Sequence, residues 1–182
     1  KMAVKWYTKA AEQGYTKSQF NLGVMYRDGV GVPQDYKMAV KWYTKAAEQG
    51  DAIAQFELGL VYELGQGIPR DYKMAVKWYT KAAEQGHSKA QNNLGLMYEK
   101  GQGVPQDYEM AFKSYTKSAK QGDASAQNNL GNMYKSVLLD RKEAVKWYTK
   151  AAKQGNAVAQ FNLGVMYALG QGAPQDYKMA FK

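Results

Sequence analysis

The chain has 182 residues, a mass of 20.4 kDa and a formal net charge of +9. It contains no cysteine, which excludes disulfides, zinc–thiolate sites and a cysteine nucleophile. No apolar run approaches the roughly 18 residues of a membrane-spanning helix. Aliphatic residues are few, whereas 15 Tyr and 4 Trp supply bulk, so the composition excludes a thick core and permits a thin one that is renewed along the chain.

The sequence repeats itself with a period of 36 residues. The segment at 35–50 recurs unchanged at 71–86, and residues 1–14 match its last fourteen letters. Such self-similarity is typical of repeat proteins. We therefore expect one array over residues 1–182. It consists of a partial repeat at 1–14 and of repeats at 15–50, 51–86, 87–122, 123–155 and 156–182, of which the repeat at 123–155 is three residues shorter.

Each repeat predicts two helices, which we call its first and second helix. In the repeat at 51–86, apolar residues recur with the helical period over 51–63 and again over 71–85. Asp51 is a good N-cap for the first helix, and Gly86 follows the second helix, where a left-handed residue is favoured. A Gly-x-Gly-x-Pro turn separates the two helices. Because repeats follow one another almost without a linker, we expect about eleven antiparallel helical segments.

One glycine lies inside the first helix of every repeat, where it costs roughly 1 kcal/mol relative to alanine. Because this loss of helix stability occurs in all five copies, we expect a steric reason for the glycine. A Trp or Tyr of a neighbouring helix would pack on the bare backbone. These glycines are Gly23, Gly59, Gly95, Gly131 and Gly164.

The repeated residues resemble the Sel1-like repeat family. Ala52-x-Ala54-Gln55-x-x-Leu58-Gly59-x-x-Tyr62 carries its first-helix pattern, and Trp78-Tyr79-x-Lys81-Ala82-Ala83-x-x-Gly86 carries its second. The resemblance covers the whole chain. It implies an all-α, right-handed superhelix (an α-solenoid) of helical hairpins that are similar to tetratricopeptide repeats. It also implies a protein-interaction scaffold, often in bacterial signalling, secretion or host contact.

The residues offer little for catalysis. His87 is the sole histidine, and it lies at a repeat start, where other copies have Tyr, Asp or Asn. We interpret it as a surface position. Carboxylates recur once per repeat at the start of the second helix, where they cap it, so they form no acid–base pair. Metal-ligand clusters and phosphate-binding loops are absent from the sequence. We expect no enzyme and no cofactor.

In tetratricopeptide-like solenoids the first helices line the concave groove. Aligning the Leu-Gly-x-x-Tyr core of each copy with those proteins assigns 24 groove positions, and much of the variation between copies falls on them. We call them the groove positions: Lys17, Phe20, Asn21, Val24, Arg27, Ile53, Phe56, Glu57, Leu60, Glu63, Lys89, Asn92, Asn93, Leu96, Glu99, Ser125, Asn128, Asn129, Asn132, Lys135, Val158, Phe161, Asn162 and Val165.

This chemistry favours a peptide or protein partner. Asparagine amides both donate and accept hydrogen bonds, so a ladder of them suits an extended backbone. The similarity to tetratricopeptide proteins implies that role for Asn21, Asn93, Asn129 and Asn162, while phenylalanines at three copies could hold apolar side chains. Two alternatives stay open. The phenylalanines could pack between helices with the asparagines merely solvated, or the array could be a structural spacer without a specific ligand.

Lysines recur every four residues on the second helices, as at Lys37, Lys41 and Lys45. Stacked repeats would align them into a basic strip on the outer surface. We interpret this strip as a solvated face. The alternative is binding to an acidic partner, a nucleic acid or an anionic membrane surface. The row varies little between copies and so carries no sequence code, and we do not expect nucleic acid as the partner.

Two further features predict local behaviour. Segments 1–13 and 175–182 are second helices without polar capping repeats, so we expect end-to-end association of copies through their exposed apolar faces. The turn at 135–142 lacks the Gly-x-Gly-x-Pro sequence. There we expect both flanking helices to persist, Asp140 to cap the second of them, and Leu138 or Leu139 to fold onto the repeat.

Overall fold

The computed structural model describes residues 2–176 and 178, and every regular element in that part of the chain is an α-helix. The first helices are α2 (Thr16–Asp28), α4 (Ala52–Leu64), α6 (Ser88–Lys100), α8 (Ala124–Ser136) and α10 (Ala157–Ala168). The second helices are α1 (Met2–Glu12), α3 (Tyr36–Glu48), α5 (Tyr72–Glu84), α7 (Tyr108–Lys120) and α9 (Arg141–Lys153). The predicted helix at 175–182 lies mostly outside the described residues.

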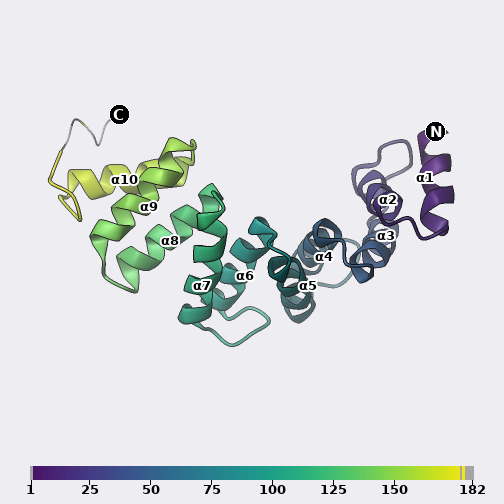
Figure 1. Ribbon diagram of the computed structural model, residues 1–182, viewed down its shortest axis with the longest axis horizontal. Coiled ribbons are helices and arrows are strands. Elements are labelled where there is room, and N and C mark those ends of the chain that lie inside the picture. Colours follow the sequence, from purple (N-terminus) through teal and green to yellow (C-terminus); the bar gives the residue numbers. More distant parts are fainter. Residues whose placement is uncertain (1, 177, 179–182) are drawn as a thin grey trace. The chain divides into compact units, whose positions relative to one another are not determined.

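The chain divides into two compact units, Lys1–Gln106 and Asp107–Lys182. In the first unit, α3 packs on α2 of its own repeat and on α4 of the next, α5 packs in the same way on α4 and α6, and α1 packs on α2. In the second unit, α9 packs in the same way on α8 and α10 (Figure 1). The expected all-α hairpin fold is therefore confirmed within each unit.

Carboxylate and amide caps set the helix starts. Asp51 Oδ1 accepts the Ala54 N–H at 2.8 Å, and Asp71 Oδ1 accepts the Met74 N–H at 3.0 Å. Asn156 caps α10 through the Ala159 N–H at 2.9 Å. Each side chain satisfies a backbone donor that has no partner inside its helix. The caps predicted from the sequence are confirmed.

In three repeats the core contains a tyrosine of the second helix packed on the glycine of the first: Tyr43 on Gly23, Tyr79 on Gly59 and Tyr148 on Gly131. Tyr79 is fully buried, and a Cβ atom added at Gly59 would lie 2.5 Å from its Cδ1. Tyr148 covers Gly131 in the same way, with a separation of 2.7 Å. Such distances are far below van der Waals contact, so any side chain at these positions would displace the ring. The predicted steric reason is confirmed for Gly23, Gly59 and Gly131, and the covering residue is the tyrosine.

A glutamine pair ties three consecutive helices together. Gln55 of α4 donates from Nε2 to the Ala47 carbonyl at the end of α3, at 3.1 Å. Its Oε1 accepts from Nε2 of Gln85, which follows α5, at 2.8 Å. The second unit repeats this arrangement with Gln127, Ala119 and Gln154. We call this arrangement the glutamine latch. Because the amides are buried or partly buried, it fixes the register of neighbouring repeats.

The short turn differs from the expectation. Both flanking helices persist and Asp140 caps α9 through the Glu143 N–H at 3.0 Å, as predicted. However, Leu138 and Leu139 do not fold onto the repeat, since 50% and 73% of their surfaces are exposed. The turn closes through hydrogen bonds from the Leu138 N–H to the Met133 carbonyl and from the Asp140 N–H to the Tyr134 carbonyl. This compact path leaves the leucine side chains pointing away from the helices.

Candidate protein-interaction surface

All 24 groove positions lie on the first helices, but their side chains differ in solvent exposure. Six are exposed: Lys17, Ile53, Lys89, Ser125, Val158 and Phe161. Three are buried: Phe56, Asn92 and Asn128. The other fifteen are half-buried: Phe20, Asn21, Val24, Arg27, Glu57, Leu60, Glu63, Asn93, Leu96, Glu99, Asn129, Asn132, Lys135, Asn162 and Val165. The positions up to Glu99 belong to the first unit, and those from Ser125 onward belong to the second.

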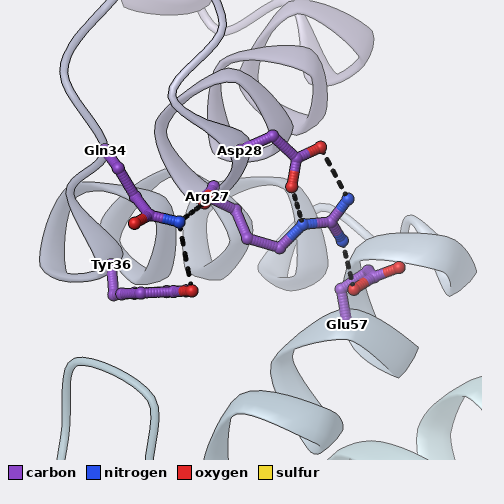
Figure 2. A network of polar contacts seen from close by, with 5 residues as sticks. All are labelled: Arg27, Asp28, Gln34, Tyr36 and Glu57. Carbon is purple, nitrogen blue, oxygen red and sulfur yellow. Dashed lines mark hydrogen bonds and ion pairs between the residues drawn. The ribbon is translucent and has the colours of Figure 1, made fainter.

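An arginine network joins two first helices in the first unit. Figure 2 shows Arg27 of α2 between its neighbour Asp28 and Glu57, which lies on α4. The Nε atom of Arg27 lies 2.7 Å from Asp28 Oδ1, and its Nη1 atom lies 2.8 Å from Glu57 Oε2. The hydrogen bond from Arg27 lowers the pKa of Asp28. Gln34 closes the network by donating to the Arg27 carbonyl at 2.7 Å and to the Tyr36 hydroxyl at 3.1 Å. Two variable groove positions therefore satisfy each other.

The next pair of first helices is joined through a core tyrosine. The Tyr79 hydroxyl donates to Glu63 of α4 at 2.5 Å and accepts from Asn93 of α6 at 3.2 Å. Burial, followed by the hydrogen bond to Glu63, raises the pKa of Tyr79. The equivalent Tyr43 hydroxyl is buried with no hydrogen-bond partner among the described residues, because Arg27 and Glu57 occupy the matching positions and bind each other.

Asparagines replace these groups in the second unit. Tyr148 donates to Asn132 Oδ1 at 2.6 Å, and burial raises the pKa of Tyr148 to about 12. Asn162 of α10 donates to Asn128 of α8 at 3.1 Å, and Asn128 donates to Asn129 at 3.5 Å. The asparagines thus already bind one another across neighbouring helices. Asn21 of the first unit differs, since its side chain makes no hydrogen bond with another described residue.

Two of the three groove phenylalanines pack on core tyrosines. The ring centroids of Phe20 and Tyr43 lie 5.9 Å apart, as do those of Phe56 and Tyr79. Aromatic pairs at this separation stabilise helix packing. Phe161 makes no such ring contact with another described residue and is 71% exposed. Interhelical packing, one of the alternatives left open by the sequence, describes Phe20 and Phe56.

His87 has a structural role at the start of α6. Its Nδ1 accepts the Ala90 N–H at 3.2 Å, and its ring stacks on Phe56 with centroids 4.6 Å apart. Burial, and then the positive charge of Lys89, lowers the pKa of His87. The cap requires a neutral ring with an unprotonated Nδ1. This histidine is half-buried rather than on the open surface.

The lysine rows of the second helices lie partly over tryptophan rings. Lys45 Nζ is 5.0 Å from the centre of the Trp42 ring, Lys81 Nζ is 5.0 Å from that of Trp78, and Lys150 Nζ is 4.0 Å from that of Trp147. These cation–π contacts hold the third lysine of a row against the protein. Lys41 and Lys77 are exposed.

Residues 2–176 and 178 lack two other kinds of functional feature. This part of the chain contains no cluster of three His, Asp or Glu side chains able to hold a metal ion. Its helices include none that is both long and apolar enough to cross a membrane.

Comparison with known proteins gives consistent matches. The Sel1 repeat model matches six times, at residues 1–15, 16–51, 52–87, 88–123, 124–156 and 157–182. No curated protein sequence matches the chain significantly.

The sequence analysis did not predict the glutamine latch, although its signal is plain. A glutamine lies at the same place in every first helix, and another precedes the glycine that ends each second helix.

Solved structures of three bacterial proteins illustrate the likeness. A protective antigen with an SLR fold from uropathogenic Escherichia coli is 43% identical, with a TM-score of 0.94 over 98% of this chain and 39% of that one. A Sel1 repeat protein from Oxalobacter formigenes is 40% identical, with a TM-score of 0.89 over 93% and 68% of the two chains. An immunity protein from Pseudomonas aeruginosa is 26% identical, with a TM-score of 0.63 over 98% and 68%.

This chain thus spans about two fifths of the length of the E. coli antigen. The family model matches along all of its 182 residues, and the solved Sel1 repeat structures share its helical hairpins. The packing of tyrosine on glycine and the glutamine latch explain why these residues recur at equivalent positions of the repeats. The chain belongs to the Sel1 repeat family.

Proposed function

We propose that the chain is a non-enzymatic scaffold that binds a peptide or a partner protein along the groove positions of its first helices. Sel1 repeat proteins are generally scaffolds for protein interactions. The proposal rests on a difference between the packing positions and the groove positions of each repeat. The core tyrosines and latch glutamines are the same in the four complete repeats, whereas the groove positions next to them change from copy to copy.

The exposed groove positions of the first unit are the best candidates for contact. Ile53 is 50% exposed on α4, and Lys17 and Lys89 occupy the same place on α2 and α6. A half-exposed isoleucine between two cations suits a partner with an apolar side chain flanked by acidic ones. Asn21 adds an amide that no described residue engages, so it is available to an extended peptide backbone.

The test is a comparison of two double variants. A partner captured by the wild-type chain is identified, and its affinity is measured by titration calorimetry. Lys17→Ala/Ile53→Ala should weaken binding at least about tenfold, because interface side chains that matter cost more than about 1.4 kcal/mol on truncation. The matched control, Lys41→Ala/Lys77→Ala, removes exposed side chains of the second helices and should leave binding unchanged.

The reverse result would assign binding to the lysine rows, and unchanged binding by both variants would place the site elsewhere. Asn93→Ala tests the proposal less sharply, because it also removes the hydrogen bond that Asn93 donates to the Tyr79 hydroxyl. Exposed Lys17 and Ile53 carry no such structural contact, so the unfolding transition of their variant should match that of the wild type.

A further inference from the structure

The turn between α8 and α9 presents three consecutive apolar side chains to solvent. The exposed fractions are 42% for Val137, 50% for Leu138 and 73% for Leu139. Longer turns of the same array behave differently, since Ile68 and Val104 pack against the core clusters of the first unit. Other turns and helix ends expose single apolar side chains, such as Val30, Leu64 and Leu169, whereas three consecutive ones are exposed in this turn.

Leu139 is also held in a strained conformation. Its φ is +56°, and it is the sole non-glycine residue with positive φ in the described part of the chain. Glycine or asparagine adopts this region readily, whereas a leucine does so at a cost in stability. Because the side chain is mostly exposed, packing does not offset that cost. Backbone strain that no packing interaction offsets is found in segments that serve a function other than folding.

Cations flank the tip on both sides. Lys135 precedes it, and Arg141 and Lys142, both exposed, follow it. The single acid within the turn, Asp140, is occupied as the cap of α9. A short aliphatic tip with flanking cations matches the interface of an anionic bilayer: the aliphatic groups enter the acyl boundary and the cations lie near headgroup phosphates. The net charge of +9 adds attraction toward the same surface.

We propose that residues 137–142 are a membrane-contact site, in which the three apolar side chains insert into the interface of an anionic bilayer and Arg141 and Lys142 contact its headgroups. A bilayer needs no shaped pocket to accept the tip, which favours lipid over a protein cleft. This site goes beyond the proposed scaffold function, because it would hold the scaffold and its partner at a membrane surface.

The absence of cysteine makes a direct test possible. Leu139→Cys is labelled with the environment-sensitive fluorophore NBD and mixed with phosphatidylcholine vesicles with or without phosphatidylserine. We expect a several-fold emission increase and a blue shift with phosphatidylserine, and quenching by spin-labelled lipids. The matched control is Lys153→Cys, labelled at an exposed residue near the other end of α9, which should show no change. An unchanged spectrum at position 139 would overturn the proposal.

Co-sedimentation of unlabelled protein separates binding from folding. Leu139→Asn relieves the backbone strain and removes the most exposed of the three apolar side chains, so it should raise the midpoint of urea unfolding while weakening vesicle binding roughly tenfold. Val30→Asn changes an exposed valine in another turn and should leave binding unchanged. If Leu139→Asn binds vesicles as tightly as wild type, or if wild type does not co-sediment, the proposal is wrong. An NBD response that requires a protein and not lipid would overturn it in favour of a protein interface.

Discussion

Protonation of the His87 ring should weaken the first unit at mildly acidic pH. The ring caps α6 through its Nδ1, and it is the sole histidine of the chain. A proton on Nδ1 removes the acceptor and places a positive charge at the positive end of the helix dipole. Loss of an N-cap costs about 1 kcal/mol. The expected change is therefore about 1 kcal/mol in the free energy of unfolding.

The direction follows from the lowered pKa of His87 in the folded chain. Well above the ordinary value of 6.5, the ring is neutral in both states and the cap contributes fully. As the pH falls below 6.5, the unfolded chain binds a proton that the folded chain resists, so stability decreases. The decrease ends once the pH has passed below the folded pKa.

The assay is urea unfolding followed by circular dichroism between pH 7.5 and 5.5, together with the NMR titration of the single imidazole. His87→Asn is the matched control, since asparagine caps α10 at the equivalent Asn156 and does not titrate in this range. Wild type should lose about 1 kcal/mol more than the control. Parallel pH profiles for the two proteins, or a His87 pKa at or above 6.5 in the folded chain, would refute the reasoning.

Three other predictions concern the scaffold. Gly59→Ala places a Cβ atom against the fully buried Tyr79 ring and should destabilise the chain by about 2–3 kcal/mol in urea unfolding; Gly50→Ala, with open space but a φ of +93°, should cost only about 1 kcal/mol. Gln55→Ala removes both hydrogen bonds of the latch, one of them buried, and should cost about 1–3 kcal/mol, measured in the same way. Trp6 is 64% exposed on α1, so concentrated protein should associate end to end, and Trp6→Ser should reduce the mass seen by light scattering; a monomer at every concentration would contradict this.

The sequence by itself determined the elements of this protein. A period of 36 residues, one cap and one terminal glycine per helix, and one internal glycine per first helix are local signals, because capping and φ preferences act within a few residues. They predicted the helix pairs, their ends and an aromatic ring on each internal glycine. Repetition supplied the rest, since every copy has to pack on nearly identical neighbours.

Only the tertiary structure decided which polar groups are free to act. Arg27 and Glu57 are far apart in the sequence, and their ion pair exists because two first helices lie side by side. For the same reason, Asn162 already binds Asn128 rather than standing ready for a peptide, whereas Asn21 has no described partner. Hydrogen bonds between repeats depend on distances that no residue pattern encodes. The same limit explains Leu139. An apolar side chain predicts a buried position, but the backbone of the shortened turn directs this one toward solvent.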